Sequence, residues 1–451
     1  MQKTHSVEYI EQYGEIVVDP FFIKDPLLYE IFKKSLPPKE AYYYFPKGKE
    51  VIDLHKKKPE KNNRRIFINV PFLEIEYKWL EKYKEIIASN PQNKLPEFWN
   101  DGLNLAYIYS TECNLEKAYQ RMINYFNWYG SFFPLNIQPG DKCVQVLNSG
   151  YLYVFGRDHQ FRPLIICQPY ILQKCLDIYS DVDIMNASIF ILQYMANYML
   201  IPGQIENWIM IVNMENTSVL SLPESVKNLI NKLSEYFIAR LYRCYILGLN
   251  ALLRILYKLI CTFVEKTTVE KVIILDNKED KRKHQDINPE NLEERFGGKA
   301  PNCIYDEENS LFPPRMPSNN FFLENENPKE ILITEEEYIE RYNAGKIPVK
   351  SASPFILEKL RKEKADKEKE EIQRKKREEA QSRIAEAKTR SELNIFTSWI
   401  SSKETFDLSK FKIKSNKFIE KANAFKIKRD RLCNGISELN EPIFSDDGNF
   451  E

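Results

Sequence analysis

The chain has little glycine and histidine, no CxxC motif and no excess of either charge. It has 451 residues, with 14 glycines and four histidines, and 65 Lys and Arg residues balance 65 Asp and Glu residues. A net charge of zero argues against a dedicated nucleic-acid-binding protein, which needs basic excess to displace counterions from phosphates. The histidines (His5, His55, His159 and His284) are scattered. Because a zinc site needs clustered ligands, the sequence predicts no metal site.

Cysteine pairs with the spacing of a disulfide framework or a metal site are also missing. The eight cysteines are Cys113, Cys143, Cys167, Cys175, Cys244, Cys261, Cys303 and Cys433. Most lie inside apolar runs, where a free thiol behaves as a small hydrophobic group. We therefore expect a reducing, cytoplasmic environment.

Long, purely apolar runs are missing as well, since even the uncharged stretch Met185–Pro202 carries Asn, Ser and Gln. Residues 238–264 read "IARLYRCYILGLNALLRILYKLICTFV", and four cations interrupt them: Arg240, Arg243, Arg254 and Lys258. The longest uncharged part, Cys244–Leu253, is shorter than the ~20 residues that a membrane-spanning helix needs. The beginning of the chain, "MQKTHSVEYIEQYGE", has neither the apolar segment of a secretory signal nor the composition of a transit peptide. We expect no membrane span.

Strand patterns alternate with helix patterns through the middle of the chain. "YLYVFG" and "RPLIICQP" flank a turn and predict a hairpin. "WIMIVNM" is a continuous apolar run, as expected of a central strand covered on both faces. "YRCYIL" and "KVIIL" predict two further strands, with helices between the strands. This order predicts an α/β fold with a layered sheet.

Two helix patterns carry most of the further argument. In "NLEKAYQRMINYFNWYG", apolar residues recur at the spacing of one buried face, and Asn114 is suited to cap the helix. From Asn250 to Val264 a second stripe is formed by Leu252, Leu256, Leu259 and Phe263, with Arg254 and Lys258 off it. We expect this stripe to face a core or a ligand.

Five segments in this order resemble the CRAL-TRIO lipid-binding family. They are "CNLEKAYQRMINYFNWYGSFF", "GRDHQFRPL", "IMIVNMENTSVLSL", the stretch from residue 239 to residue 275, and "INPENLEERFGG". In the second, Phe161 replaces a family glycine; in the third, Asn213 replaces an aspartate. The resemblance covers about residues 92–300.

The resemblance implies a mostly parallel sheet that floors an apolar pocket, with a gate helix over it and a small helical subdomain before it. Residues 250–264 match the gate, so Leu253 joins the stripe residues as a pocket candidate. The family consists of lipid carriers rather than enzymes, and we find no catalytic constellation. No cofactor is expected other than a bound lipid.

The head-group site departs from that of phosphatidylinositol-binding members. Their Glu-Arg pair before the third strand and their Lys after the gate correspond here to Ala239, Arg240 and Lys271. Their two hydroxyl residues in the central strand correspond to Trp208 and Met210. Arg240 and Lys271 are therefore the head-group candidates, and Trp208 and Met210 are expected in the pocket wall. We expect inositol head groups to be excluded.

The two ends of the chain have a different composition. We expect an extended arm over residues 1–91, a helical subdomain over 92–134 and the lipid-binding domain over 135–300. A proline- and acid-rich linker is expected over 301–352, a long, charged, solvated helix over 353–394, and a segment that docks onto a partner over 395–451. Opposite charges four residues apart, such as Glu371 and Lys375, favour this helix.

Two functions remain open from the sequence. The first is an architectural subunit without enzymatic activity that uses its arms to bind other protein subunits of a large assembly. The host assembly would lie in the cytoplasm and would belong to the cytoskeleton, for example the axoneme of a cilium. A mitochondrial complex is the less favoured host. The alternative is a cytosolic protein that carries a phospholipid or other lipophile between membranes. The departures at the head-group site and the long arms favour the first, which is compatible with retained lipid binding, and the gate-like helix favours the second. We predict the first and keep the second as the alternative.

Overall fold

The structure is a computed structural model. It describes residues 35–55, 57–90, 95–96, 99–132, 141–217, 224–262, 264–303, 320–323 and 327–401. The chain divides into two compact units, Met1–Glu363 and Lys364–Glu451.

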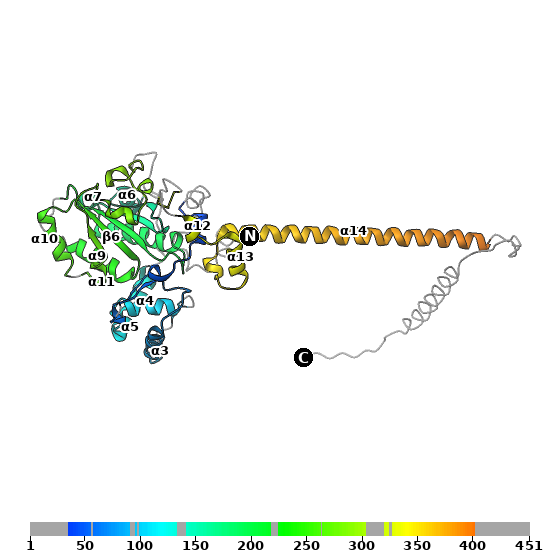
Figure 1. Cartoon of the computed structure of the whole chain (residues 1–451), viewed down its shortest axis with the longest axis horizontal. Helices are drawn as coiled ribbons and strands as arrows, with labels where there is room; N and C mark the ends of the chain where they lie inside the picture. The colour runs from blue at the N-terminus through cyan, green and yellow to red at the C-terminus, as the bar shows by residue number, and fades with distance from the viewer. Residues whose placement is uncertain are drawn as a thin grey trace, which may run out of the picture. The chain divides into compact units, whose positions relative to one another are not determined.

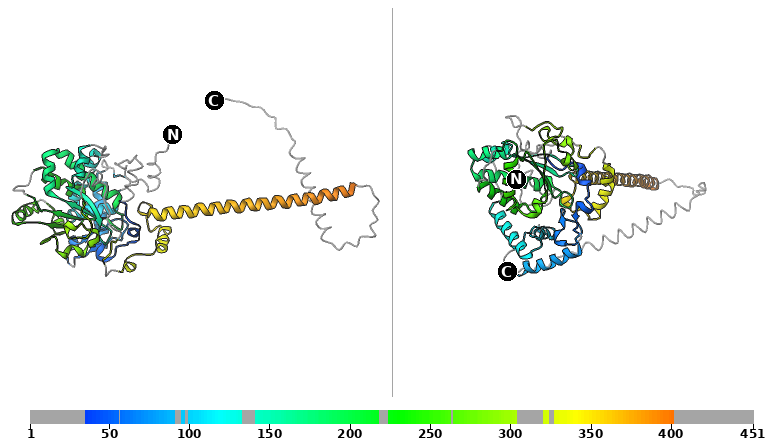
Figure 2. Two further views of the ribbon diagram at one scale, coloured as in Figure 1. Left: turned by 90° about the horizontal axis from the view of Figure 1, so that it is seen from above. Right: turned by 60° about the vertical axis from the view of Figure 1, so that its left-hand side comes forward.

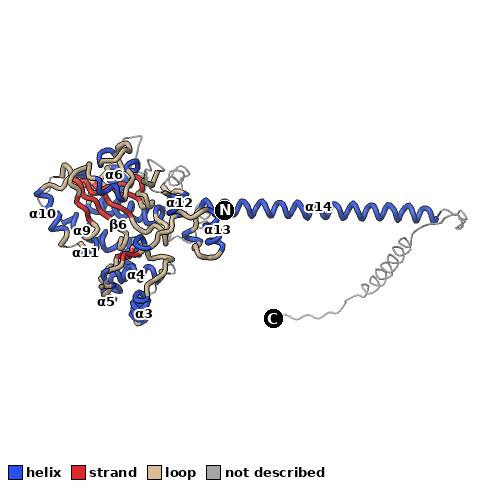
Figure 3. Tube along the Cα trace, viewed as in Figure 1, coloured by secondary structure: helices blue, strands red, loops and turns tan. Residues whose placement is uncertain are grey.

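A sheet forms the centre of the first unit. Among the described residues it has five strands, in the order β3-β4-β5-β6-β7. Strands β3 and β4 are antiparallel, and the other neighbours are parallel. The predicted α/β fold with a mostly parallel sheet is confirmed (Figures 1 and 3). The strands are β3 (Leu152–Arg157), β4 (Pro163–Cys167), β5 (Trp208–Asn213), β6 (Leu241–Leu247) and β7 (Val272–Ile274).

Helices connect the strands as the sequence pattern predicts. Met195–Met199 continues α8 as a π-helical turn, and the Asn250 side chain caps α10 by accepting a hydrogen bond from the Leu253 backbone N–H at 2.9 Å. Helices α9, α10 and α11 lie together at one end of the domain (Figure 1). The bounds are α6 (Lys142–Asn148), α7 (Pro169–Ile178), α8 (Asp181–Tyr194), α9 (Glu224–Tyr236), α10 (Ala251–Ile260) and α11 (Lys266–Val269).

Alternation along β5 and β6 divides the sheet into two apolar faces, because successive side chains of a strand point to opposite sides. Ile209, Ile211 and Tyr245 belong to one buried cluster. Met210 and Cys244 belong to another cluster, beneath α10. One face is therefore closed by core packing, and the other faces the gate helix.

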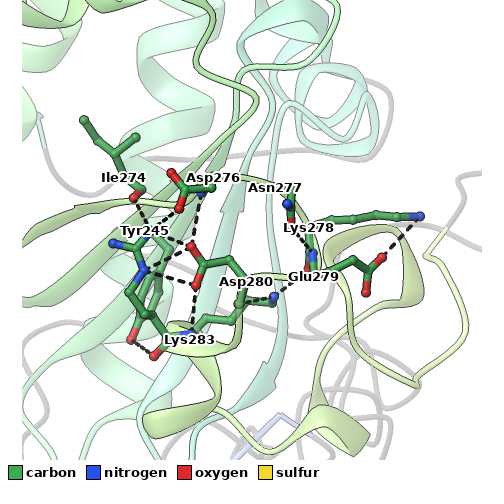
Figure 4. A network of polar contacts seen from close by, with 9 residues as sticks. Tyr245, Ile274, Asp276, Asn277, Lys278, Glu279, Asp280 and Lys283 are labelled. Carbon is green, nitrogen blue, oxygen red and sulfur yellow. Dashed lines mark hydrogen bonds and ion pairs between the residues drawn. The ribbon is translucent and has the colours of Figure 1, made fainter.

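The segment after β7 closes the first face through a polar network (Figure 4). Lys283 is buried, and its Nζ donates to the backbone oxygens of Lys278 at 2.6 Å and Asp280 at 2.8 Å. Gly297 packs against the same loop with φ of 81°, and a Cβ there would lie 1.9 Å from the Lys278 oxygen. A Cβ at Gly298 would lie 1.9 Å from the Leu292 oxygen, so both glycines at the end of "INPENLEERFGG" are required by a close backbone approach.

The small helical subdomain begins earlier than the predicted boundary at residue 92. Helix α3 (Glu74–Ala88) packs in one cluster with α4 (Asp101–Tyr109) and α5 (Leu115–Phe132) (Figure 2). The predicted cap of α5 is present, since Asn114 Oδ1 accepts from the Lys117 backbone N–H at 3.0 Å. A buried ion pair between Arg64 and Glu76 joins α3 to the strand pair β1 (Ile52–Asp53) and β2 (Asn63–Arg64).

Parts of both predicted arms belong to the core of the domain. Tyr43 lies 5.5 Å from Tyr338 between ring centroids, and Tyr44 forms a β-bridge with Leu332. The predicted linker contains α12 (Pro328–Ile331) and α13 (Glu335–Asn343). The expectation of an extended arm and linker is therefore wrong for these segments, because the aromatic side chains of one bury those of the other. Residues 1–34 and 304–319 lie outside the described ranges.

The predicted long charged helix is present as α14, Pro354–Ser401 (Figure 3). Ile356 and Leu357, in its first turn, are buried in the main core, whereas residues 361–391 are exposed throughout. The docking segment predicted over 395–451 falls mostly outside the described residues. In the part of the chain that the structure describes, no helix has the length and apolar character needed to cross a membrane.

Candidate functional site

An apolar cavity of about 380 Å³ lies between the sheet and the helices α7–α11. It lies on the sheet face opposite the core of Ile209 and Ile211. Its wall includes Leu152, Leu172, Leu192, Trp208, Met210, Val212, Leu229, Leu233, Phe237, Leu241, Cys244, Leu249, Leu253, Tyr257 and Ile260. A concave, mostly apolar space with few polar groups is the usual form of a small-molecule site.

Helix α10 covers this cavity with a different face from the predicted one. Leu253 is buried and lines the cavity, together with Tyr257 and Ile260. Leu252 and Leu259, which were expected inside, are exposed. The prediction that these two face inward is wrong, because α10 is apolar on two faces and helical spacing alone does not choose between them. The Leu256 side chain and Phe263 lie outside the described parts of the structure.

The outer face of α10 is an exposed apolar strip. Leu252, Ile255 and Leu259 recur at i, i+3 and i+7, and Ile255 is 67% exposed. Arg254 and Lys258, both exposed, lie between them in the sequence. The helix therefore presents apolar and cationic side chains to its surroundings.

Trp208 and Met210 line the cavity floor from β5, as expected. Trp208 is buried, and its ring centroid lies 6.1 Å from that of Phe237, which follows α9. These side chains fill space and provide no hydroxyl. Ala239 also lines the cavity, with φ of 58°.

The two head-group candidates lie in different places. Lys271 lines the cavity, and its Nζ donates to the Leu241 backbone oxygen at 2.8 Å. Burial and the charge of Arg65 lower the pKa of Lys271 to about 8, whereas Glu265 acts in the opposite direction. Arg240 is not among the lining residues, and its guanidinium donates to the Glu206 backbone oxygen at 3.0 Å. The structure therefore brings only Lys271 to the cavity.

Sequence reasoning missed a charged group in the cavity wall, Glu265. It precedes α11, lines the cavity and forms an ion pair with Arg121 of α5. Arg121 also donates to the Ser234 backbone oxygen at 2.7 Å, so one guanidinium joins the helical subdomain, the end of α9 and the turn after α10. Only the three-dimensional contact reveals this role, because Arg121 and Glu265 are 144 residues apart.

The residues of α10 and the turn before it that line the cavity also form an apolar stripe in the sequence, different from the stripe that was predicted to face inward. Leu249, Leu253, Tyr257 and Ile260 recur at i, i+4, i+8 and i+11.

Cys167 and Cys244 also line the cavity, and burial raises the pKa of each thiol to about 12. Both thiols are therefore protonated at neutral pH and pack as small apolar groups. Among the described residues no group of three His, Cys, Asp or Glu side chains is arranged to hold a metal ion.

A family model matches the part of the chain that contains the five-stranded sheet. Residues 147–298 match the family model described as CRAL/TRIO domain. Among solved structures, the crystal structure of Sfh5 is similar with 16% sequence identity and a TM-score of 0.38, covering 61% of this chain and 99% of that one. No curated protein matches the chain. Residues 147–298 are therefore a CRAL/TRIO domain, a domain of the family of lipid-binding and lipid-transfer proteins.

Proposed function

We propose that the CRAL/TRIO domain binds one apolar ligand in the cavity beneath α10 and exchanges it at a membrane surface. The observation that carries this proposal is the double apolar character of α10. One face of the helix closes an apolar cavity of about 380 Å³, and the other exposes Leu252, Ile255 and Leu259. Proteins with this domain are generally carriers rather than enzymes, and we assign no reaction to this chain.

The outer strip suits contact with a lipid surface. Amphipathic helices bind in the membrane interface by burying apolar side chains near the acyl boundary, while basic side chains meet anionic head groups. Leu252 and Ile255 provide the apolar part, and Arg254 and Lys258 provide the charge. Movement of α10 at the membrane would open the cavity to the bilayer.

The cavity floor argues against an inositol ligand. A polyhydroxylated head group needs several hydrogen-bonding partners when it leaves water. Trp208, Met210 and Ala239 line the cavity at the positions where the family's phosphatidylinositol binders carry hydroxyls and a carboxylate. We expect phosphatidylinositol to bind no better than other lipids of equal chain length.

Transfer of a fluorescent lipophile between vesicles tests the membrane step. The double variant L252Q/I255Q should transfer about tenfold more slowly, since each substitution removes apolar area that would enter the bilayer. Ile178→Gln is the matched control, because Ile178 is 69% exposed on α7, outside the outer strip of α10. Equal rates for the double variant and this control would contradict membrane exchange through α10.

The second candidate is a docking subunit, and α14 is the observation that favours it. Residues 361–391 are exposed, and ion pairs such as Glu371–Lys375 at 3.0 Å stabilise the helix without an apolar stripe. On this proposal the helix is a spacer, and residues 395–451 bind other protein subunits of a cytoplasmic, axonemal or mitochondrial assembly.

Truncation separates this candidate from a free carrier. In cell extracts, the full chain should sediment with a large assembly, and a chain that ends at residue 394 should sediment as a free protein. Identical sedimentation of the two chains would contradict the docking role and leave lipid binding unaffected.

A further inference from the structure

Two of the described residues that line the cavity carry a charge, Glu265 and Lys271. Their partners differ. Glu265 is neutralised from outside the cavity by the ion pair with Arg121. Lys271 donates to a backbone carbonyl, that of Leu241, and no ion pair of Lys271 occurs among the residues that the structure describes. The cavity wall therefore contains one cation without a carboxylate of its own.

The surroundings of Lys271 explain why this cation is poorly compensated. Arg65, which follows β2, adds a second positive charge nearby, and Glu265, before α11, is the opposing negative charge. Leu241 of β6 contributes a neutral oxygen, and Val272 and Val269 beside Lys271 line the cavity with apolar groups. A partly buried ammonium in such surroundings is stabilised when an anion takes the place of lost water.

We propose that the ligand is a single-chain lipophilic carboxylic acid, with its carboxylate paired to Lys271 and its chain in the apolar space beneath α10. This inference rests on the proposed binding of one apolar ligand and specifies its chemical class.

Size and polarity of the cavity both favour this class over a two-chain phospholipid. The cavity volume of about 380 Å³ lies near the lower end of the ~300–1,000 Å³ typical of small-molecule sites. A phosphodiester head group needs several donors, and of the floor residues Trp208 and Met210 only Trp208 carries one, its indole N–H. One ammonium can satisfy one carboxylate through a charge-assisted hydrogen bond.

Binding of oleic acid and of oleyl alcohol to the full chain, stripped of bound lipid, tests the inference. The two probes share a chain and differ in the head group. Wild-type protein should bind the acid at least tenfold more tightly than the alcohol. Lys271→Met should weaken acid binding about tenfold to a hundredfold, the loss expected for one hydrogen bond between charged groups, and leave alcohol binding unchanged. Lys271→Arg should retain most of the acid affinity.

Lys266→Met is the matched control, since Lys266 is exposed five residues earlier and does not line the cavity. It should bind the acid as wild type does. Thermal unfolding of each variant checks folding, and the alcohol provides a second check because its binding needs the same cavity.

The pH dependence gives an independent readout. With the pKa of Lys271 near 8 in the free protein, its ammonium is present at pH 7 and is lost above pH 8. Acid affinity should therefore be constant from pH 6 to pH 7.5 and fall by up to about tenfold per pH unit above 8. The alcohol, and the acid with Lys271→Met, should show no such fall.

The outcomes separate this inference from the proposed function. Equal binding of acid and alcohol, unaffected by Lys271→Met, overturns the acid assignment and leaves a general apolar site. Binding of anionic two-chain phospholipid from vesicles, with no binding of oleic acid, also overturns it. Binding of none of these probes contradicts the proposed function itself.

Discussion

Phe161 occupies a backbone conformation that a bulky side chain rarely adopts. Its φ is 63°, at the hairpin turn between β3 and β4, where the family resemblance expects glycine. The ring is fully buried and lies 5.1 Å from Phe321 and 5.9 Å from Tyr44 between centroids. Aromatic packing therefore stabilises a turn that is locally strained.

Because aromatic packing stabilises the turn and the positive φ destabilises it, we expect glycine at position 161 to be tolerated better than alanine. Phe161→Ala should lower the free energy of unfolding by about 3–5 kcal/mol, because it removes a buried ring and keeps the strain. Phe161→Gly should be less destabilising by about 1 kcal/mol, since glycine adopts positive φ without penalty. Urea unfolding of both variants measures the difference, and a less stable glycine variant would show that the turn is not strained.

Glu335 joins three segments through its carboxylate. It accepts a hydrogen bond from Tyr43 Oη at 3.0 Å and pairs with Lys39 at 2.7 Å and Lys359 at 2.5 Å. Hydrogen bonds from Lys359 and then Lys39 lower the pKa of Glu335 to about 2. A carboxyl whose pKa is lowered by folding stabilises the protein above its unfolded pKa, and this contribution is lost as pH falls toward 2.

Stability against pH should therefore differ between wild type and Glu335→Gln. Wild type should be more stable at pH 7, by less than about 1 kcal/mol because the pair is partly exposed. The difference should shrink between about pH 5 and pH 2. Thermal unfolding across this range measures it. A constant difference would mean that Glu335 titrates normally in the folded protein.

At the scale of the element, the orientation of α10 is the feature that decides the site. An aspartate at Leu253 would place a carboxylate in the apolar cavity wall and should cost several kcal/mol. The same substitution at Ile255, on the exposed face, should change the free energy of unfolding by no more than about 0.5 kcal/mol. Chemical unfolding of L253D and I255D measures the two losses of unfolding free energy. A larger loss for I255D than for L253D would mean that the face of α10 carrying Ile255 packs against the sheet.

Sequence patterns predicted the elements better than their faces. The strand-helix order followed from period-2 and period-3.6 patterns, whereas the family resemblance, not periodicity, led us to expect Trp208 and Met210 in the cavity wall, which they line. The prediction of which face of α10 points inward was wrong, because apolar residues occur on two sides of this helix. Leu253 is the residue that packs with β6, and this contact cannot be read from the spacing alone. Glu265 gave no local signal, since its partner Arg121 lies on a distant helix.

The whole molecule joins segments far apart in the chain. Tyr43 and Tyr338 contact each other across 295 positions, and the first turn of α14 is buried beside them. Composition identified the ends as polar and irregular. It could not show this packing, because the aromatic residues of each segment are buried by residues far away in the sequence.

Two truncations test where the domain ends. A chain that stops at residue 363 keeps Ile356 and Leu357 in the core, so its melting temperature should equal that of the full chain. A chain that stops at residue 353 loses both side chains and should be destabilised by about 3–6 kcal/mol, the usual contribution of two buried aliphatic residues. Calorimetry of the two chains measures this. Equal stability would mean that the start of α14 is not part of the core.

The central claim is that the cavity beneath α10 holds one apolar ligand. Native mass spectrometry of the full chain, purified without detergent, tests it most directly. We expect a 1:1 complex with a lipophile that organic solvent releases, and a lower occupancy in Met210→Trp, which fills the cavity from β5. A wild-type chain that shows only its own mass, even after incubation with a total lipid extract, would contradict the account.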